Sequence, residues 1–209
     1  MNTLFLNLAS HQSLIACVHT GQVVSRAELH PRMTDLDLMQ AFEAVVTQAG
    51  WKHADVNRIA CVLGLGGFTS LRVACAFTNA LSFALGIPSA GIHLSEVKLA
   101  QGSRGFKSPA TRGAWWLHST KKDLLFIRGF GKFTEIKPEP ECISIADLGT
   151  YVHAGDAWTG ELIPEHESLV QAKGMLKADE KLVQEILPQF LDMLTYESQT
   201  LLPWYGRGW

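Results

Sequence analysis

A glycine-rich turn between an apolar strand and a long apolar helix is the feature that most limits the fold of this chain. Residues Arg58–Leu63 form a short apolar run that is typical of a central strand. The turn Gly64–Gly67 follows, and a helix is predicted over Thr69–Leu85, with Gly86 and Pro88 as its stop signal. A strand that turns directly into a helix indicates an α/β fold.

The glycine turn does not carry the residues of a standard nucleotide clamp. Loops of this kind at the start of a helix often face phosphate groups. This one lacks the lysine of a P-loop and the glycine spacing of a dinucleotide fingerprint. The eight histidines are scattered, and no two of them lie four apart on a predicted helix. We therefore expect no metal, no cofactor and no catalytic residue in this chain.

The segments before the glycine turn predict a meander followed by a helix. Thr3–Leu8, Ser13–His19 and Val23–Leu29 are short apolar runs separated by tight turns, as in three antiparallel strands. A first helix is predicted to begin after the N-cap Thr34 and to close at Gly50. With the central strand and its helix, these elements predict an α/β lobe.

The second half of the chain is predicted to form a separate, smaller lobe. Residues 101–110 are rich in glycine, serine and basic residues, which is typical of a linker. A hairpin signal follows, then a possible strand at Phe133–Lys137 and a helix over Asp179–Thr200. We therefore expect two domains, residues 1–100 and residues 101–209.

Composition indicates a soluble protein of a reducing compartment. Of the 209 residues, 47% are hydrophobic, which is enough for one sizeable core or two small ones. The four cysteines form no CxxC pair and read as buried free thiols. The first residues lack the basic and apolar regions of a signal peptide, and no apolar run approaches the roughly 20 residues of a membrane span. We expect a cytoplasmic protein that does not bind membranes.

The charge of the chain is uneven, although the net charge is only −2. Residues 98–137 carry nine Lys and Arg against two Asp and Glu, whereas residues 138–209 carry four against twelve. The basic segment could be a weak patch for a polyanion or simply a solvated face. No interleaving of aromatic and basic residues typical of a single-strand binder accompanies it.

The two predicted helices of the first lobe carry more apolar residues than one sheet face can cover. A helix that is apolar nearly all round must be buried on two sides. The second side can be the protein's own core or another chain, and we expect a protein–protein surface. The predicted anchors are Leu36, Met39, Phe42, Leu71, Cys75 and Asn79, with Phe68 and Arg72 at the rim.

These residues also carry a resemblance to a known family. The segment Gly64–Ala74 resembles the GPGSFTGLRVG pattern of the TsaB (YeaZ) family, whose helix likewise ends in LGIP. The chain keeps Gly64, Gly66, Phe68, Thr69, Leu71, Arg72 and Val73 of that pattern. Residues Leu202–Arg207, near the end of the sequence, resemble the closing P-x-Y-x-R of the same family.

The resemblance implies an actin-like, RNase H-like α/β fold of two lobes with mixed sheets and flanking helices. Family members take part in making threonylcarbamoyladenosine at position 37 of tRNA. TsaB is not the catalyst there; it binds the TsaD transferase subunit, which bears the metal, and a TsaE ATPase joins the complex. The resemblance therefore implies a TsaD-like partner, a TsaE-like ATPase, and tRNA reached only through the complex. The apolar surface of the two predicted helices could also form a homodimer when the partner is absent.

Several positions depart from the family pattern, and two other functions stay open. Asn7 stands near where the family has an aspartate, and Leu65, Gly67, Ser70 and Ala74 replace other pattern residues. One alternative is an enzyme, either a small actin-like phosphotransferase or a glycoprotease-type hydrolase. A phosphotransferase needs carboxylates to hold magnesium, and the first loop offers only Asn7. The other alternative is a self-associating scaffold with no role in tRNA modification.

Overall fold

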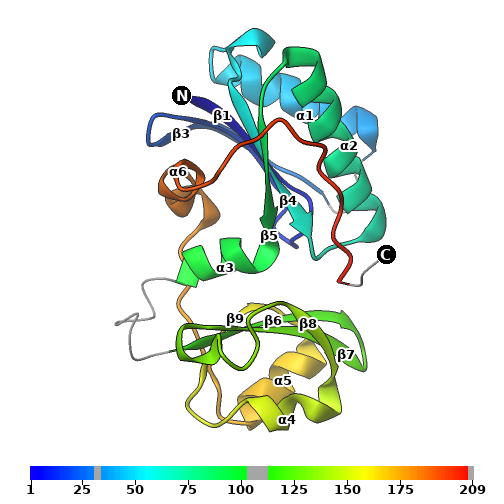
Figure 1. Cartoon of the computed structure of the whole chain (residues 1–209), viewed down its shortest axis with the longest axis vertical. Coiled ribbons are helices and arrows are strands. Elements are labelled where there is room, and N and C mark those ends of the chain that lie inside the picture. The colour runs from blue at the N-terminus through cyan, green and yellow to red at the C-terminus, as the bar shows by residue number, and fades with distance from the viewer. Residues whose placement is uncertain (31–33, 103–112, 207–209) are drawn as a thin grey trace. The chain divides into compact units, whose positions relative to one another are not determined.

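The computed structural model describes residues 1–30, 34–102 and 113–206, and these residues form two compact units (Figure 1). The first unit contains Met1–Leu94 together with Val183–Trp209, and the second contains Ser95–Leu182. The division predicted at residue 100 lies close to the first boundary. The assignment of residues 183–209 to the second lobe is corrected, because the described residues 183–206 pack with the first unit.

A five-stranded mixed sheet forms the centre of the first unit. Its strands lie in the order β3-β2-β1-β4-β5, with antiparallel pairs β1–β2 and β2–β3 and parallel pairs β1–β4 and β4–β5. The strands are β1 (Asn2–Asn7), β2 (Leu14–His19), β3 (Gln22–Glu28), β4 (Arg58–Gly64) and β5 (Ser89–His93). The predicted meander and the predicted central strand are both confirmed.

Helices α1 (Asp35–Gln48) and α2 (Phe68–Leu85) share a core with alternate residues of the sheet. Leu4 and Leu6 of β1 point to this side because successive strand residues face opposite ways. The rings of Phe42 and Phe77 meet edge to face at 5.6 Å and join the two helices. Helix α6 (Val183–Asp192) also belongs to this unit and contacts β2 and β3.

The starts of the two helices differ in how they are capped. Thr34 caps α1 as predicted, since its side chain accepts from the backbone N–H of Asp37 in a capping box. Helix α2 begins at Phe68, one residue before its predicted start, with Gly67 as the N-cap and no side-chain cap. Two glycines before it allow close packing: a Cβ at Gly64 would lie 2.2 Å from the carbonyl oxygen of Trp204, and one at Gly66 would lie 2.6 Å from the Cα of Ala9. The glycine turn thus lets the backbones near Ala9 and Trp204 pack closely against it.

Helix α2 is long and apolar enough, by length and composition alone, to cross a membrane. This is weak evidence, because the core helix of a soluble protein passes the same test. Here α2 packs on β4 and β5 of the first unit.

The second unit holds another mixed sheet, in the order β10-β9-β6-β7-β8. Its strands are β6 (Ala114–Lys121), β7 (Leu124–Phe130), β8 (Glu141–Ser144), β9 (Ala157–Glu161) and β10 (Leu176–Lys177), and its helices are α3 (Leu94–Gly102), α4 (Leu148–Tyr151) and α5 (Pro164–Ala172). Trp115, Trp116 and Trp158 are fully buried. The predicted hairpin is confirmed, but the strand expected at Phe133–Lys137 is wrong: a 3-10 turn over Gly131–Phe133 continues into a further turn through residue 136.

The chain beyond α6 is irregular, although the sequence predicts a helix over Asp179–Thr200. The helix ends at Asp192, and the segment that follows is held along β5 and α2 by specific contacts. The backbones of Ser89 and Glu197 exchange two hydrogen bonds of 2.9 and 3.0 Å, and Leu201 enters the core of the first unit. These contacts with residues distant in the sequence stabilise an irregular conformation, although the local apolar pattern predicts a helix.

We expect Leu201→Ala to lower the free energy of unfolding by about 2 kcal/mol or more, because truncating a buried leucine leaves a cavity. Leu202 gives a matched control, since Leu201 is 4% exposed and Leu202 is 62% exposed. Leu202→Ala should change stability by less than about 0.5 kcal/mol. Urea unfolding of both variants measures the difference, and equal losses would show that the C-terminal segment is not part of this core.

Candidate functional site

A groove of about 560 Å³ runs between α1 and α2 on the first unit. Its lining is mostly apolar, with one charged residue. The lining residues are Leu38, Met39, Thr69, Arg72, Val73, Ala76, Phe77 and Ala80. The small side chains of Ala76 and Ala80 leave room for a neighbouring backbone to approach closely.

Four of the eight predicted interface residues are exposed at or near this groove. Met39 and Arg72 line it, and Met39 is 43% exposed. Leu36, three residues before Met39 on α1, and Phe68, the first residue of α2, are also largely exposed. Apolar side chains left in water on two neighbouring helices are typical of a surface that another molecule covers.

Three other predicted anchors are buried in the protein's own core, which corrects their assignment. Phe42 packs against Phe77, and Leu71 is fully buried. Cys75 is 3% exposed and forms a hydrogen-bonded thiol pair with Cys61 of β4. The hydrogen bond with Cys75, together with burial, raises the pKa of Cys61 well above its usual value, so that thiol stays protonated. These three side chains are therefore buried inside the first unit and are not exposed for a partner to contact.

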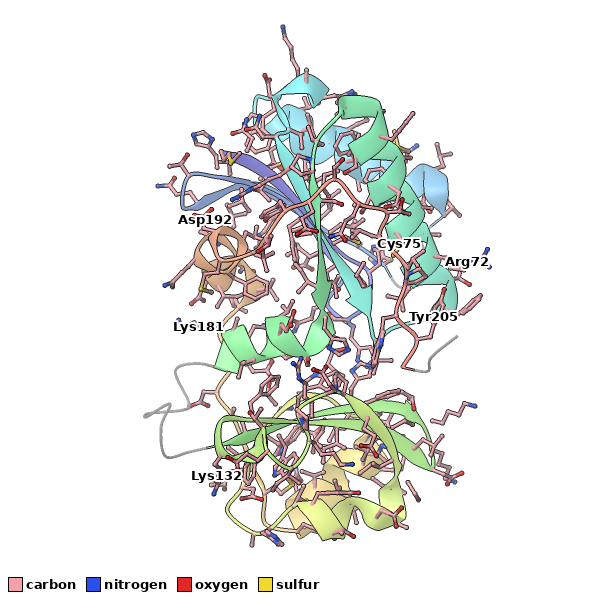
Figure 2. All side chains as sticks on the ribbon, in the orientation of Figure 1. Arg72, Cys75, Lys132, Lys181, Asp192 and Tyr205 are labelled. Atoms are coloured by element: carbon pink, nitrogen blue, oxygen red, sulfur yellow. The ribbon has the colours of Figure 1, made fainter. Side chains whose placement is uncertain are left out.

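Asn79 has a structural partner within the chain. Its side-chain nitrogen donates to the carbonyl oxygen of Leu201 at 2.9 Å, and its side-chain oxygen accepts from the backbone N–H of Leu201 at 2.9 Å. The amide therefore fastens the C-terminal segment to α2. Figure 2 shows Tyr205 from this segment near Arg72 and Cys75.

One exposed residue near this surface was not predicted. Phe83, in the last turn of α2, is 90% exposed and lines a second, smaller hollow with Asn79 and Ile87. The helical pattern alone did not separate Phe83 from the buried residues of α2, because apolar residues occur all around the helix. Only the packing of α2 on the sheet decides which side stays open.

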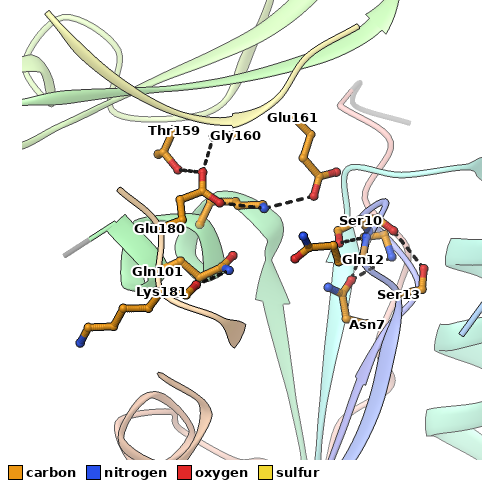
Figure 3. A network of polar contacts seen from close by, with 12 residues as sticks. Asn7, Ser10, Gln12, Ser13, Gln101, Thr159, Gly160, Glu161, Glu180 and Lys181 are labelled. Carbon is orange, nitrogen blue, oxygen red and sulfur yellow. Dashed lines mark hydrogen bonds and ion pairs between the residues drawn. The ribbon is translucent and has the colours of Figure 1, made fainter. Parts of the chain in front are cut away.

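The turn after β1 is occupied by its own hydrogen bonds. The side-chain oxygen of the buried Asn7 accepts from the backbone N–H groups of Ala9 and Ser10, at 3.0 and 3.3 Å (Figure 3). Ser10 in turn accepts from the backbone N–H of Gln12 at 2.9 Å. The side chain of Asn7 therefore shapes this turn.

The second unit contains a buried ionic cluster that links α3 to β9. Lys98 lies 3.2 Å from an oxygen of Glu161 and 3.3 Å from an oxygen of Glu180. Glu180 also accepts from the hydroxyl of Thr159 and from the backbone of Gly160 (Figure 3). Within the described part of the chain, no group of three or more His, Cys, Asp or Glu residues is placed to hold a metal ion. The contacts of this cluster join α3 to β9 within the second unit, which indicates a structural role.

Comparisons with known proteins agree with this architecture. Residues 31–111 match the family described as TsaD, tRNA N6-adenosine threonylcarbamoyltransferase. No curated protein sequence matches the chain. YeaZ from Pseudomonas aeruginosa is similar in structure, with a TM-score of 0.67 and 17% identity over 98% of this chain and 99% of that chain. A second similar structure is an uncharacterized protein with similarity to peptidase YEAZ from Pseudomonas aeruginosa. It has a TM-score of 0.68 and 17% identity over 99% of both chains.

The expected fold class is thereby confirmed. Both mixed sheets with flanking helices have counterparts in a solved relative over nearly the whole length. The TsaD match covers α1, α2 and the glycine turn, which carry the groove. The chain therefore shares the fold of YeaZ over nearly its whole length, and its residues 31–111 are similar to the TsaD family.

Proposed function

We propose that this chain is a non-catalytic binding subunit that supports a TsaD-like transferase making threonylcarbamoyladenosine at position 37 of tRNA. The groove between α1 and α2 is the proposed contact with that partner. The YeaZ-like fold and the TsaD-family similarity of residues 31–111 support this assignment. The exposed apolar groove is the observation that carries it.

The groove suits a helical partner for two physical reasons. Leu71, Ala74, Cys75 and Thr78 of α2 are buried in the first unit. Other residues of this apolar helix are exposed and open to a second surface; they include Phe68, Arg72, Ala76, Ala80 and Phe83. Alanines in the groove permit close approach of another helix, which gains packing that larger side chains would prevent. Apolar area removed from water drives such an association.

In this proposal the chemistry belongs to the complex. The glycine turn and Asn7 are engaged in contacts within the chain, which supports a role in binding over a role in catalysis. The chain would act in the cytoplasm, with a TsaE-like ATPase joining the complex and tRNA reached only through it. A homodimer through the same groove would form when the transferase is absent.

Loss of this chain from its own cell should lower threonylcarbamoyladenosine on the tRNAs that read ANN codons. Mass spectrometry of nucleosides from a depleted strain measures the modification. Re-expression of the wild-type chain should restore it, and a Met39→Asp variant that accumulates to the same level should not. Unchanged modification after complete depletion would contradict the proposal.

The isolated chain should bind tRNA only weakly, with a Kd above about 10 μM at physiological salt, in the range of non-specific binding. Several cations of the basic segment are already paired: Lys98 with Glu161 and Glu180, Arg128 with Glu96 at 3.9 Å, and Lys137 with Glu141. A shift assay across salt concentrations tests this. Tight binding that weakens steeply with salt would contradict it.

A further inference from the structure

The last described residues of the chain form a strap across the first unit. We define the C-terminal strap as Glu197–Tyr205, which runs alongside α2 in Figure 1. Glu197 pairs with Ser89 at the edge of the sheet, and Leu201 is fastened to Asn79. Near its end, the backbone N–H of Trp204 donates to the carbonyl oxygen of Leu63 at 2.8 Å. These contacts place Tyr205 beside the first turn of α2.

The end of the strap forms a layered stack with two residues of α2. The rings of Tyr205 and Phe68 lie nearly parallel, with centroids 4.8 Å apart. The guanidinium of Arg72 lies 5.4 Å from the centroid of the Phe68 ring. Stacked rings and a cation near an aromatic ring are both attractive arrangements. Tyr205 therefore restrains Phe68, and Phe68 restrains Arg72.

Arg72 is the one charged residue in the lining of the groove. Among the residues that the structure describes, no carboxylate lies within ion-pair distance of it. Burial raises the pKa of Tyr205, against the effect of the nearby Arg72 charge, so the phenol stays neutral and does not neutralise that charge. The guanidinium is thus presented at the groove with its charge unmatched by the described part of the chain.

We propose that the C-terminal strap positions Arg72 to bind an acidic residue of the protein that docks in the groove. The partner is the TsaD-like subunit, and the inference rests on the proposed function. A flexible arginine loses rotamer freedom when it forms an ion pair. A side chain already restrained by the stack loses less, so binding gains affinity through preorganisation. Tyr205 is a positioning residue that acts through Phe68.

The test is calorimetric titration of the TsaD-like subunit into the full chain at low and high salt. Arg72→Gln should weaken binding about tenfold at low salt and remove much of the salt dependence. Tyr205→Ala should weaken it about fivefold, and Tyr205→Phe should restore wild-type affinity because it keeps the stacked ring. In the double variant, Tyr205→Ala should add little to Arg72→Gln, because both changes remove the same contact.

Leu202→Ala, which alters an exposed strap residue outside the stack, is the matched control and should bind as the wild type does. Thermal unfolding should be nearly the same for all variants. Wild-type affinity in Tyr205→Ala, or fully additive losses in the double variant, would overturn the positioning role while leaving the proposed function intact. Failure of the wild-type chain to bind the transferase at all would overturn both.

Discussion

Replacing Lys98 with methionine should lower the free energy of unfolding by roughly 3–5 kcal/mol, the cost of leaving buried charges without their partner. The Lys98 side chain is 5% exposed, and it lies between the carboxylates of Glu161 and Glu180. Methionine fills a similar volume but carries no charge. The two carboxylates would then repel each other in a site where water screens them poorly.

Urea unfolding followed by tryptophan fluorescence reports this loss, because Trp115, Trp116 and Trp158 are buried in the same unit. Lys121→Met is the control, since Lys121 is exposed at the end of β6 and should contribute less than about 0.5 kcal/mol. An unfolding midpoint equal to that of the wild type would show that the cluster does not hold α3 against β9.

The second large effect on stability is expected when an aspartate is introduced at a buried position of the first unit and not at an exposed one. Cys75→Asp should destabilise the first unit by roughly 3 kcal/mol or more, because a carboxylate beside Cys61 would be buried without a partner. Met39→Asp introduces the same charge on an exposed side of α1 and should leave the unit folded. Circular dichroism during thermal unfolding separates the two variants. Equal stability in both would contradict the burial of Cys75.

Much of the first unit could be predicted because its signals are local. The meander, the cap at Thr34 and the stop at Gly86 depend on residues that are close in sequence. The fate of the C-terminal segment could not be predicted in this way. Its helical pattern is outweighed by contacts more than a hundred residues away, such as Leu201 with Asn79. Strand β9 was missed because its parallel pairing with β6 is also a distant contact.

The candidate site shows the same limit. Residues of α2 were predicted as a surface because apolar side chains occur around the whole helix, and periodicity does not say which side meets the sheet. Packing divides them: Leu71 and Cys75 are buried in the first unit, whereas Phe68 and Arg72 are exposed. The pairing of Asn79 with the strap also depends on the tertiary fold.

The most direct test of the account is the affinity of the purified chain for the TsaD-like transferase of the same organism. We expect a stable complex in light scattering and a Kd that Met39→Asp weakens about a hundredfold, equivalent to roughly 2.7 kcal/mol, because docking would bury an unpaired carboxylate. Leu202→Ala should bind as the wild type does. A folded Met39→Asp variant that binds as tightly as the wild type would show that the groove between α1 and α2 is not the docking surface.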